Sequence, residues 1–243
     1  MKKQLLLACT MLVVCTSIAF AQKFQPAGEE WITKWYSMDL VTVTGGHTVS
    51  AAHDWLKEGT NSKITDASVT TAKGLKALQG IKTVNLKDNG GELKWSVVTI
   101  NPDNSRNMSV SHGKVDETNI EWYGIIVITS PNQRTTTMHP AHDDYGHIWL
   151  NGDKVYNNPA WTGGVKTVTT PTKVTLNAGE NILLFRCGES GGDDYINLHF
   201  DAGDKDLKIV PTTDDKFFEV IKSLPVEPAG KLATTWGEIK QSH

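Results

Sequence analysis

Residues 147–156 read HIWLNGDKVY, and this stretch decides the fold class. Two strand-like runs flank Asn151-Gly152, a dipeptide that favours a type I′ turn because both positions readily adopt positive φ. A two-residue turn also fixes the register of the hairpin, which places three apolar side chains together on the core-facing surface: Ile148, Leu150 and Val155. The opposite surface is expected to carry three ring side chains: His147, Trp149 and Tyr156.

Further strands are expected on both sides of this hairpin. Runs rich in β-branched, aromatic or alternating apolar residues cover six ranges: 93–97, 121–129, 133–139, 166–176, 181–187 and 194–200. A short helix is expected over residues 50–59, with Ser50 as its N-cap and Gly59 at its end, and another over residues 214–224. Short strands separated by Gly, Asn and Asp predict a mainly-β protein, an antiparallel jelly-roll sandwich with short flanking helices.

The chain of 243 residues divides into four stretches. Residues 1–21 are expected to be a secretory signal peptide, with a charged start, an apolar run of about ten residues and the cleavage site Ala19-Phe20-Ala21. Residues 22–92 are an N-terminal mixed segment that packs on the sandwich or contributes strands to it. Residues 93–210 are the jelly-roll core, and residues 211–243 are a helix and a C-terminal tail. We therefore expect a secreted protein, located outside the cell, on its surface or in the periplasm.

Composition excludes several classes of function. The formal net charge is −3, and loss of Lys2 and Lys3 with the leader would make it −5, which argues against a nucleic-acid partner. No later apolar run approaches the roughly 20 residues of a membrane-spanning helix, so we expect no integral membrane segment. Outside the leader Cys187 stands alone, so stability must come from packing rather than from disulfides.

Residues 142–156 (HDDYGHIWLNGDKVY) resemble the S-D-D-G-x-x-[VI]-W-[LI]-N-G-x-x-V signature of secreted jelly-roll modules found on bacterial glycoside hydrolases. These modules are related to the protective-antigen lectin-like domains. Residues 176–185 (LNAGENILLF) are similar to a second strand motif of the family, and the match covers about residues 93–202. The chain departs from the pattern at three positions: His142 for Ser, Tyr145 for Gly and Arg186 for Lys.

The resemblance implies a non-catalytic binding module whose ligand is a glycan or polysaccharide. Other cell-surface or secreted proteins are further candidate partners. The alternative is a structural or adhesive sandwich of a surface protein that binds no sugar.

Asp143-Asp144 is the most chemically suggestive pair in the chain. A hard cation such as Ca²⁺ takes six to eight oxygen ligands, and adjacent carboxylates can provide several of them. In related lectin-like domains such a pair holds calcium, which in turn holds sugar hydroxyls, so the resemblance implies Ca²⁺ as cofactor with Asp143 and Asp144 as ligands. The alternative is that both aspartates cap backbone N–H groups in a turn before the hairpin. Glu189, Asp193 and Asp194 form a second acidic cluster. These residues either contribute to the same cation site, form a site of their own or lie in a solvated loop.

Aromatic rings suit the C–H face of a pyranose, and three are candidate stacking platforms: Trp161, Tyr156 and Tyr195. Trp161 is the best of them because it lies on a predicted loop, whereas a half-buried place in the sheet is favoured for Trp149. The acidic residues and Trp161 belong to three predicted loops: 140–146, 157–164 and 188–194. If these loops converge at one end of the sandwich, they surround one shallow depression.

Two short motifs also resemble those of serine hydrolases. Ser50-Ala51-Ala52-His53 and Gly188-Glu189-Ser190-Gly191-Gly192 would supply a base and a nucleophile, with Asp143 or Asp144 to orient the base. The segment after Ser190 is predicted to be a strand, whereas the nucleophile elbow of esterases needs a helix there. A secreted serine hydrolase using Ser190 and His53 is therefore the remote alternative, and we expect that the protein is not an enzyme.

Overall fold

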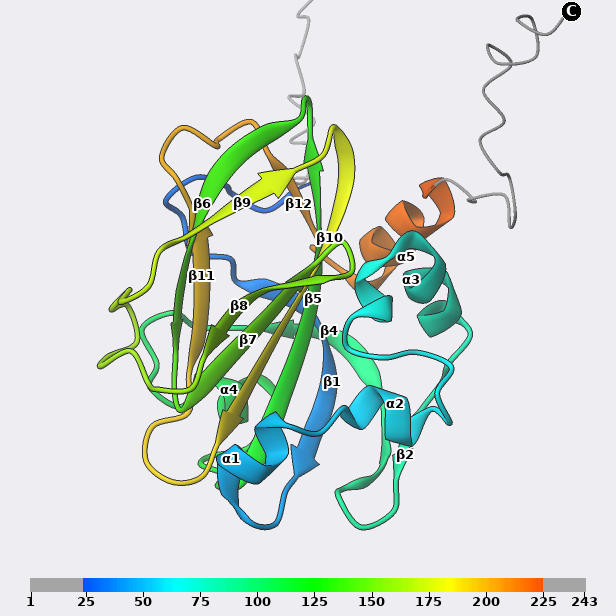
Figure 1. The fold of residues 1–243 in the computed structure, drawn as a ribbon, viewed down its shortest axis with the longest axis vertical. Helices are drawn as coiled ribbons and strands as arrows, with labels where there is room; N and C mark the ends of the chain where they lie inside the picture. The colour runs from blue at the N-terminus through cyan, green and yellow to red at the C-terminus, as the bar shows by residue number, and fades with distance from the viewer. Residues whose placement is uncertain (1–23, 225–243) are drawn as a thin grey trace, which may run out of the picture.

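The computed structural model describes residues 24–224, and β-strands packed in layers form its centre (Figure 1). The expected signal peptide and the tail that contains KLATTWGEIK lie outside the described residues. The prediction of a mainly-β, antiparallel sandwich with short flanking helices is confirmed. Within residues 24–224, no helix is both long and apolar enough to cross a membrane.

The larger sheet has seven antiparallel strands, in the order β4-β1-β5-β10-β7-β8, with β12 also pairing with β5. Its strands are β1 (Lys34–Thr42), β4 (Trp95–Thr99), β5 (Ile120–Ser130), β7 (Tyr145–Leu150), β8 (Asp153–Asn158), β10 (Gly179–Glu189) and β12 (Lys208–Val210). The smaller sheet has the order β11-β6-β9, formed by β11 (Ile196–Phe200), β6 (Arg134–His142) and β9 (Thr172–Leu176). A separate hairpin joins β2 (Val84–Leu86) to β3 (Gly91–Leu93).

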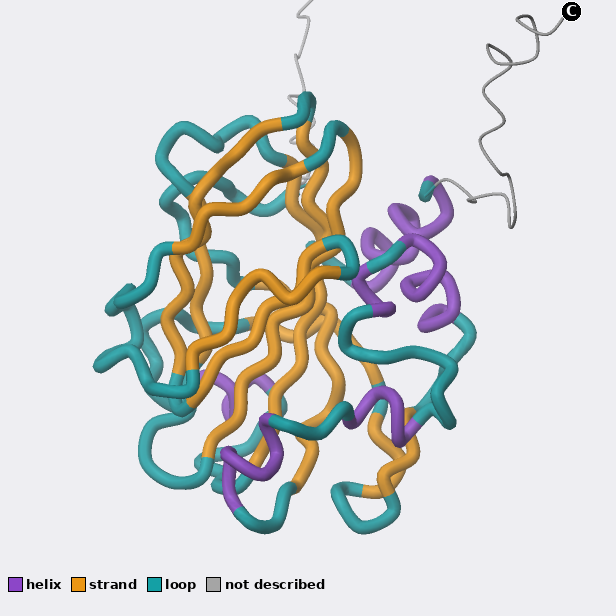
Figure 2. Tube along the Cα trace, viewed as in Figure 1, coloured by secondary structure: helices purple, strands orange, loops and turns teal. Residues whose placement is uncertain are grey.

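Helices cover the face of the larger sheet that the smaller sheet leaves open. The helical elements are α1 (Gly46–Ala51), α2 (Trp55–Gly59), the 3₁₀ turn η1 (Ser68–Thr70), α3 (Ala72–Gln79), α4 (Asn107–Ser111) and α5 (Asp214–Ser223). Helix α4 is the exception, because its Met108 packs in the core between the two sheets. Figure 2 shows α2, α3 and α5 grouped on one side of the larger sheet. The larger sheet therefore has a hydrophobic core on each face, one against the smaller sheet and one against these helices.

Strand β5 shows how the sequence encodes this double burial. Its alternate residues Trp122 and Ile126 pack between the two sheets, whereas Tyr123 and Ile125 pack under the helices. A strand buried on both faces needs apolar side chains that point both ways, which is why residues 122–128 form a continuous apolar run rather than an alternating one.

The predicted hairpin forms β7 and β8, and its turn has the expected conformation, with φ of 54° at Asn151 and 99° at Gly152. The two pairs nearest the turn follow the predicted register, but a bulge then pairs Ile148 with Tyr156 instead of with Val155. Tyr156 consequently joins the core between the sheets, so the prediction that placed it on the opposite face is wrong. Val155 is only partly buried, although it packs against the same core.

The helix predicted over residues 50–59 is two helices, α1 and α2, so the single-helix prediction is wrong. Asp54 is the N-cap of α2, because its side chain accepts a hydrogen bond from the Lys57 backbone N at 2.8 Å. Ser50 is not a cap; it is buried near the end of α1, and its hydroxyl accepts a hydrogen bond from Trp55 Nε1 at 3.0 Å. The helix predicted near the C-terminus is confirmed as α5.

Candidate functional site

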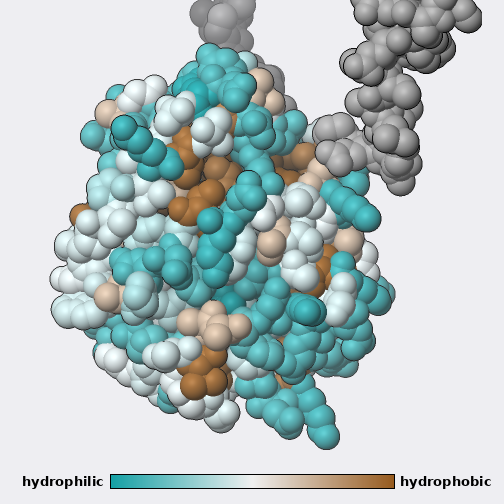
Figure 3. Space-filling view, in the orientation of Figure 1, coloured by the Kyte–Doolittle hydropathy of each residue, from teal (hydrophilic) through white to brown (hydrophobic). Residues whose placement is uncertain are grey.

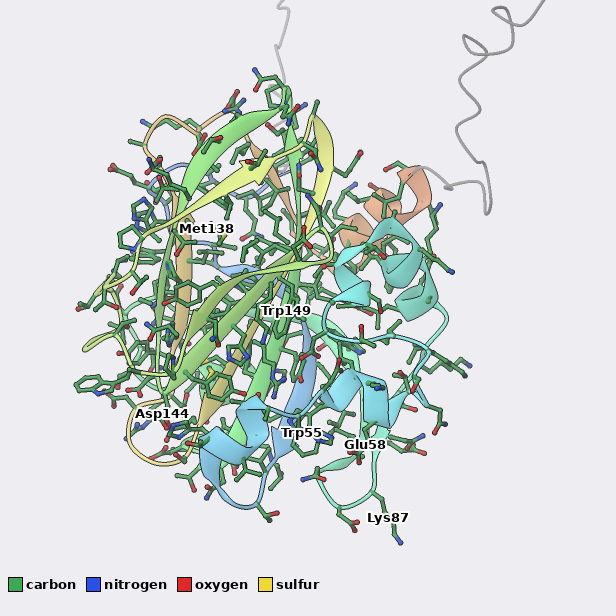
Figure 4. The ribbon with its side chains drawn as sticks, in the orientation of Figure 1. Trp55, Glu58, Lys87, Met138, Asp144 and Trp149 are labelled. Carbon is green, nitrogen blue, oxygen red and sulfur yellow. The ribbon has the colours of Figure 1, made fainter. Side chains whose placement is uncertain are left out.

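Three carboxyl groups meet at one end of the sandwich, where β6, β7 and β10 end or begin. Asp143 and Asp144 form the connection between β6 and β7, joined by a cis peptide bond, and Glu189 is the last residue of β10. One oxygen from each residue lies within 4.8 Å of the other two. Figure 4 shows Asp144 at the lower end of the strands, close to α1. We call these three residues the acidic cluster.

Backbone hydrogen bonds hold the two aspartates against the neighbouring strands. The Asp144 N–H donates to the Gly188 carbonyl at 2.8 Å, and the Asp143 N–H donates to the Tyr195 carbonyl at 3.0 Å. The Asp144 carboxylate also accepts hydrogen bonds from the Ser190 backbone N at 3.1 Å and the Ser190 hydroxyl at 3.0 Å. Asp144 therefore does cap a backbone N–H, but in the loop after β10 rather than in its own turn.

Glu189 is the most deeply placed member of the acidic cluster. Its side chain is fully buried, Oε1 accepts a hydrogen bond from the Gly191 backbone N, and Oε2 has no hydrogen-bond partner. Burial, followed by the charge of Asp144, raises the pKa of Glu189 to about 8. Burial and the charge of Asp144 likewise raise the pKa of Asp143 to about 7. The cluster thus brings three carboxyl groups together in a place where burial penalises their charged forms.

The protein supplies little positive charge to this cluster. Within residues 24–224, no lysine or arginine lies within ion-pair distance of Asp143, Asp144 or Glu189. His47 in α1 lies close to the cluster: its Nδ1 is 3.0 Å from Asp144 Oδ2 and 2.6 Å from Ser190 Oγ. Sequence reasoning missed His47, because nothing in its local pattern indicates that α1 reaches this end of the sandwich.

The three predicted loops, 140–146, 157–164 and 188–194, lie together at one end of the sandwich. The Thr162 backbone N donates to the His142 carbonyl at 3.0 Å, which binds the loop after β8 to the residue before Asp143. The Gly164 backbone N donates to the Tyr195 hydroxyl at 2.8 Å, which binds the same loop to the segment before β11. Trp161 lies in this loop beside Thr162, and its side chain is 59% exposed. An exposed aromatic ring and the acidic cluster therefore belong to adjoining loops.

Two of the three predicted stacking platforms are buried, which corrects those predictions. Tyr195 is fully buried, and the Tyr156 hydroxyl lies inside the core, 2.8 Å from His142 Nε2. A ring whose faces are packed against protein cannot stack on a ligand, so these tyrosines hold the loops in place instead. Trp149, expected to be half-buried in the sheet, is instead buried in the core under the helices (Figure 4).

The second acidic cluster predicted from the sequence is divided in the structure. Only Glu189 joins the two aspartates. Asp193 forms an ion pair with Arg106 at 3.1 Å, and Asp194 accepts hydrogen bonds from the Ser109 backbone N at 3.0 Å and the Ser109 hydroxyl at 2.6 Å. Asp193 and Asp194 therefore already have ion-pair or hydrogen-bond partners, whereas Glu189 in the acidic cluster has a carboxyl oxygen without one.

The hydrolase triad is not assembled, so that alternative is wrong in the form predicted. His53 Nε2 lies 2.6 Å from Glu58 Oε2, and it is His47 that contacts Ser190. Both the Ser190 hydroxyl and the Asp144 carboxylate approach the same nitrogen of His47, Nδ1. A catalytic triad needs one ring nitrogen to receive the serine proton and the other to be held by the carboxylate, so this arrangement is not a proton relay.

No protein-family model matches the chain, and no curated protein matches it. Among solved structures, the chain is similar to a native family 35 carbohydrate-binding module from Clostridium thermocellum, with 17% identity, a TM-score of 0.25, and coverage of 38% of this chain and 72% of the module. A second likeness is to Xyl-CBM35 in complex with a disaccharide that contains glucuronic acid, with 20% identity, a TM-score of 0.23, and coverage of 38% and 68%. A third is to the PA14 domain of the MpAFP antifreeze protein, with 12% identity, a TM-score of 0.36, and coverage of 75% and 96%. All three likenesses are distant.

Proposed function

We propose that the acidic cluster binds one Ca²⁺ ion and that the protein is a secreted, non-catalytic module that holds a glycan at this end of the sandwich. The observation that carries the proposal is Glu189 Oε2, a fully buried carboxylate oxygen without a hydrogen-bond partner, beside two further carboxylates. A buried carboxylate without a partner is costly, so Glu189 holds a proton in the metal-free protein, as its raised pKa indicates, and a bound cation would replace that proton.

The donor set favours a hard cation. The three residues offer only carboxylate oxygens, which suit Ca²⁺ better than the nitrogen- and sulfur-preferring transition metals. Calcium also accepts irregular coordination and leaves positions for water or for ligand hydroxyls. A secreted module would encounter enough calcium for a weak site, since extracellular modules bind it with dissociation constants of about 10⁻⁴ to 10⁻³ M.

Trp161 supports a glycan as the ligand. Its exposed ring lies in the loop that is hydrogen-bonded to His142, next to Asp143 in the chain. An aromatic face that packs against sugar C–H groups, beside a cation that coordinates sugar hydroxyls, combines the apolar and polar contacts that a sugar requires.

A glycan array, probed with the protein in calcium and again in EDTA, tests this function. We expect binding that requires calcium and that falls at least tenfold in Trp161→Ala, while Val115→Ala, a substitution at another exposed apolar side chain, binds normally. Calcium-independent binding, or equal binding by Trp161→Ala, would contradict the proposed site. Calcium-dependent stabilisation without binding to any glycan would favour the structural or adhesive role instead.

A further inference from the structure

Two histidines lie opposite each other on the outer face of the smaller sheet. His139 in β6 and His199 in β11 are direct partners in the strand register. Their chain neighbours Met138 (Figure 4), Leu198 and Phe200 pack in the core between the sheets, so both histidines project from the other face of the smaller sheet. The two imidazole rings are parallel, with an interplanar angle of 4° and centroids 4.5 Å apart. We call these two residues the histidine pair.

One nitrogen of each ring in the histidine pair is held by an oxygen acceptor. His139 Nε2 lies 2.8 Å from Asp201 Oδ1, and His199 Nδ1 lies 2.8 Å from the Phe200 carbonyl oxygen. A carbonyl oxygen can only accept a hydrogen bond, as can an ionised carboxylate, so each of these two nitrogens carries a proton and donates. In the neutral imidazole the second nitrogen then has a free lone pair, which assigns one lone pair to His139 Nδ1 and one to His199 Nε2.

Both of these lone-pair nitrogens can be reached from solvent. Within residues 24–224 neither makes a hydrogen bond, and neither is among the buried side-chain atoms that lack a partner. The His139 side chain is 22% exposed, and His199 is likewise partly exposed. Figure 3 shows a mainly hydrophilic to neutral surface on the left of the view, the side on which Figure 1 places β6 and β11. An ion from solution therefore has access to both nitrogens.

The surroundings hold the two rings as the surroundings of metal-binding histidines do. A histidine that binds a metal through one nitrogen usually donates the N–H of the other to a carboxylate or a backbone carbonyl, which are the two acceptors found here. Asp201 is itself fixed, because the Thr137 backbone N donates to its Oδ2 at 3.2 Å. The Trp31 ring lies at 88° to the His199 ring, with the centroids 4.5 Å apart. Both imidazoles are thus oriented in the metal-free protein.

The donor atoms of the histidine pair select the class of ion. Imidazole nitrogens suit Zn²⁺, Cu²⁺ and Ni²⁺, whereas Ca²⁺ and Mg²⁺ take oxygen ligands. A zinc ion about 2.0–2.1 Å from each nitrogen requires the two nitrogens to be about 3 Å apart, so the stacked rings must tilt toward each other by rotation of their side chains. The negative charges of Glu29 and Asp201 lie near His199 and favour a cation.

We propose that His139 Nδ1 and His199 Nε2 bind one divalent transition-metal ion on the outer face of the smaller sheet, with Asp201 as a positioning residue for His139. Water fills the remaining coordination positions. This site is independent of the proposed function, because it shares no residue with the acidic cluster and binds a different class of cation.

Long-range ¹H–¹⁵N correlation spectra of the histidine side chains test the site in the full protein. ZnCl₂ is titrated at pH 7.5 in excess CaCl₂, and each histidine is observed separately, so zinc bound elsewhere is distinguished. We expect the His139 Nδ1 and His199 Nε2 resonances to shift together and to saturate with a single zinc ion. Calcium alone should shift neither resonance. Absence of a zinc-dependent shift at these two nitrogens, or an equal response to calcium, would overturn the proposal.

Substitutions show whether both histidines are ligands. His199→Phe keeps a ring in the stack but removes its nitrogens, so calorimetry with ZnCl₂ should show binding at least tenfold weaker than in the wild type. His139→Phe should have the same effect and serves if His199→Phe does not fold. His53→Phe is the matched control, because His53 is also a partly exposed histidine that contacts a carboxylate, Glu58, at 2.6 Å, and it should leave the zinc affinity of the pair unchanged. Unchanged affinity in both His139→Phe and His199→Phe would overturn the site.

Asp201→Asn tests the positioning role of Asp201. The amide can donate as well as accept, so it no longer fixes the proton on His139 Nε2. Zinc binding should weaken by about tenfold, as for other changes to groups that orient metal ligands. In the metal-free variant, the two His139 nitrogen resonances should move toward each other as the tautomers mix, a change that loss of packing alone would not produce. Wild-type zinc affinity together with wild-type His139 resonances would contradict the role given to Asp201.

Discussion

Strand β10 contributes to two groups of carboxylates, one with an arginine as its counter-ion and one without any arginine or lysine. Arg186, in the middle of the strand, is fully buried and donates to Glu121 at 2.7 Å and to Asp66 at 2.8 Å. Two further N–H groups donate to the backbone carbonyls of Ser50 and His53, both at 2.6 Å. Three residues further along the same strand, Glu189 lies among carboxylates with no arginine or lysine in contact, within the part of the chain that the structure describes.

The difference shows where the chain provides its own counter-ion and where it does not. The Arg186 group connects the N-terminal segment to the centre of the larger sheet, where no ion could enter and leave freely. The acidic cluster lies at the loop end, where the Asp144 side chain is still 22% exposed. Buried carboxylates need compensation in both places, and in the second group no arginine or lysine provides it, so burial raises the pKa values of Asp143 and Glu189.

Removing the internal counter-ion should have the largest effect. Arg186→Met leaves Glu121 and Asp66 buried without their partner, so the free energy of unfolding should fall by about 3–5 kcal/mol, as for other broken buried pairs. Urea denaturation measures the loss. Lys216→Met, which breaks the exposed pair with Glu219, is the control and should change stability by about 0.5 kcal/mol or less. A loss in Arg186→Met no larger than in the control would show that the two carboxylate groups do not differ as described.

Local sequence patterns predicted the sheets well, because turn residues and strand periodicity act over short distances. The Asn151-Gly152 turn and the continuous apolar run of β5 are examples. The bulge that brings Tyr156 into the core has no such local signal, since it depends on how β7 and β8 fit against the smaller sheet.

The candidate site was predictable only in part for the same reason. Asp143 and Asp144 are adjacent in the sequence, so their proximity was certain from the start. Glu189 and His47 reach them through strand pairing and through the position of α1, which only the complete fold determines. The sequence placed Glu189 with Asp193 and Asp194, but it contained no sign that Arg106 and Ser109 would satisfy those two.

The stability of the protein should depend on pH, and calcium should show which part of that dependence comes from the acidic cluster. The pKa of Asp143 is raised to about 7 and that of Glu189 to about 8, in each case above the unfolded value. Such groups stabilise the fold while they are protonated, and this stability is lost as the pH rises through the folded-state pKa values. The melting temperature of the metal-free protein should therefore fall from about pH 4, near the unfolded pKa values, to about pH 8, where the folded-state groups have also lost their protons.

Calcium separates the acidic cluster from the Arg186 group in this experiment. Asp66, beside Arg186, has its pKa raised to about 7 by burial, so it contributes a fall in the same direction. Millimolar calcium should cancel only the part that comes from the acidic cluster, and the stabilisation by calcium should grow as the pH rises. A calcium effect that is equal at both ends of the range, or larger at low pH, would contradict the pKa shifts of Asp143 and Glu189.

Neutralising a member of the acidic cluster should have the smallest effect on the metal-free fold. Asp143→Asn removes one negative charge from a group that lacks a counter-ion, so at pH 8 its free energy of unfolding should equal or exceed that of the wild type. Glu121→Gln, in the compensated group, should instead be destabilising, because Arg186 then loses its charged partner. Chemical denaturation in EDTA measures the free energy of unfolding of the two variants. A larger loss of stability in Asp143→Asn than in Glu121→Gln would contradict the difference between the two carboxylate groups.

Isothermal titration calorimetry with CaCl₂ tests most directly whether the acidic cluster is a cation site. The wild type should bind one calcium ion per chain, and Asp143→Asn should bind at least tenfold more weakly or not at all. Asp206→Asn is the matched control, since Asp206 already pairs with Arg134 at 2.6 Å, and it should bind calcium as the wild type does. Absence of calcium binding by the wild type, or equal binding by Asp143→Asn, would show that the acidic cluster is not a calcium site.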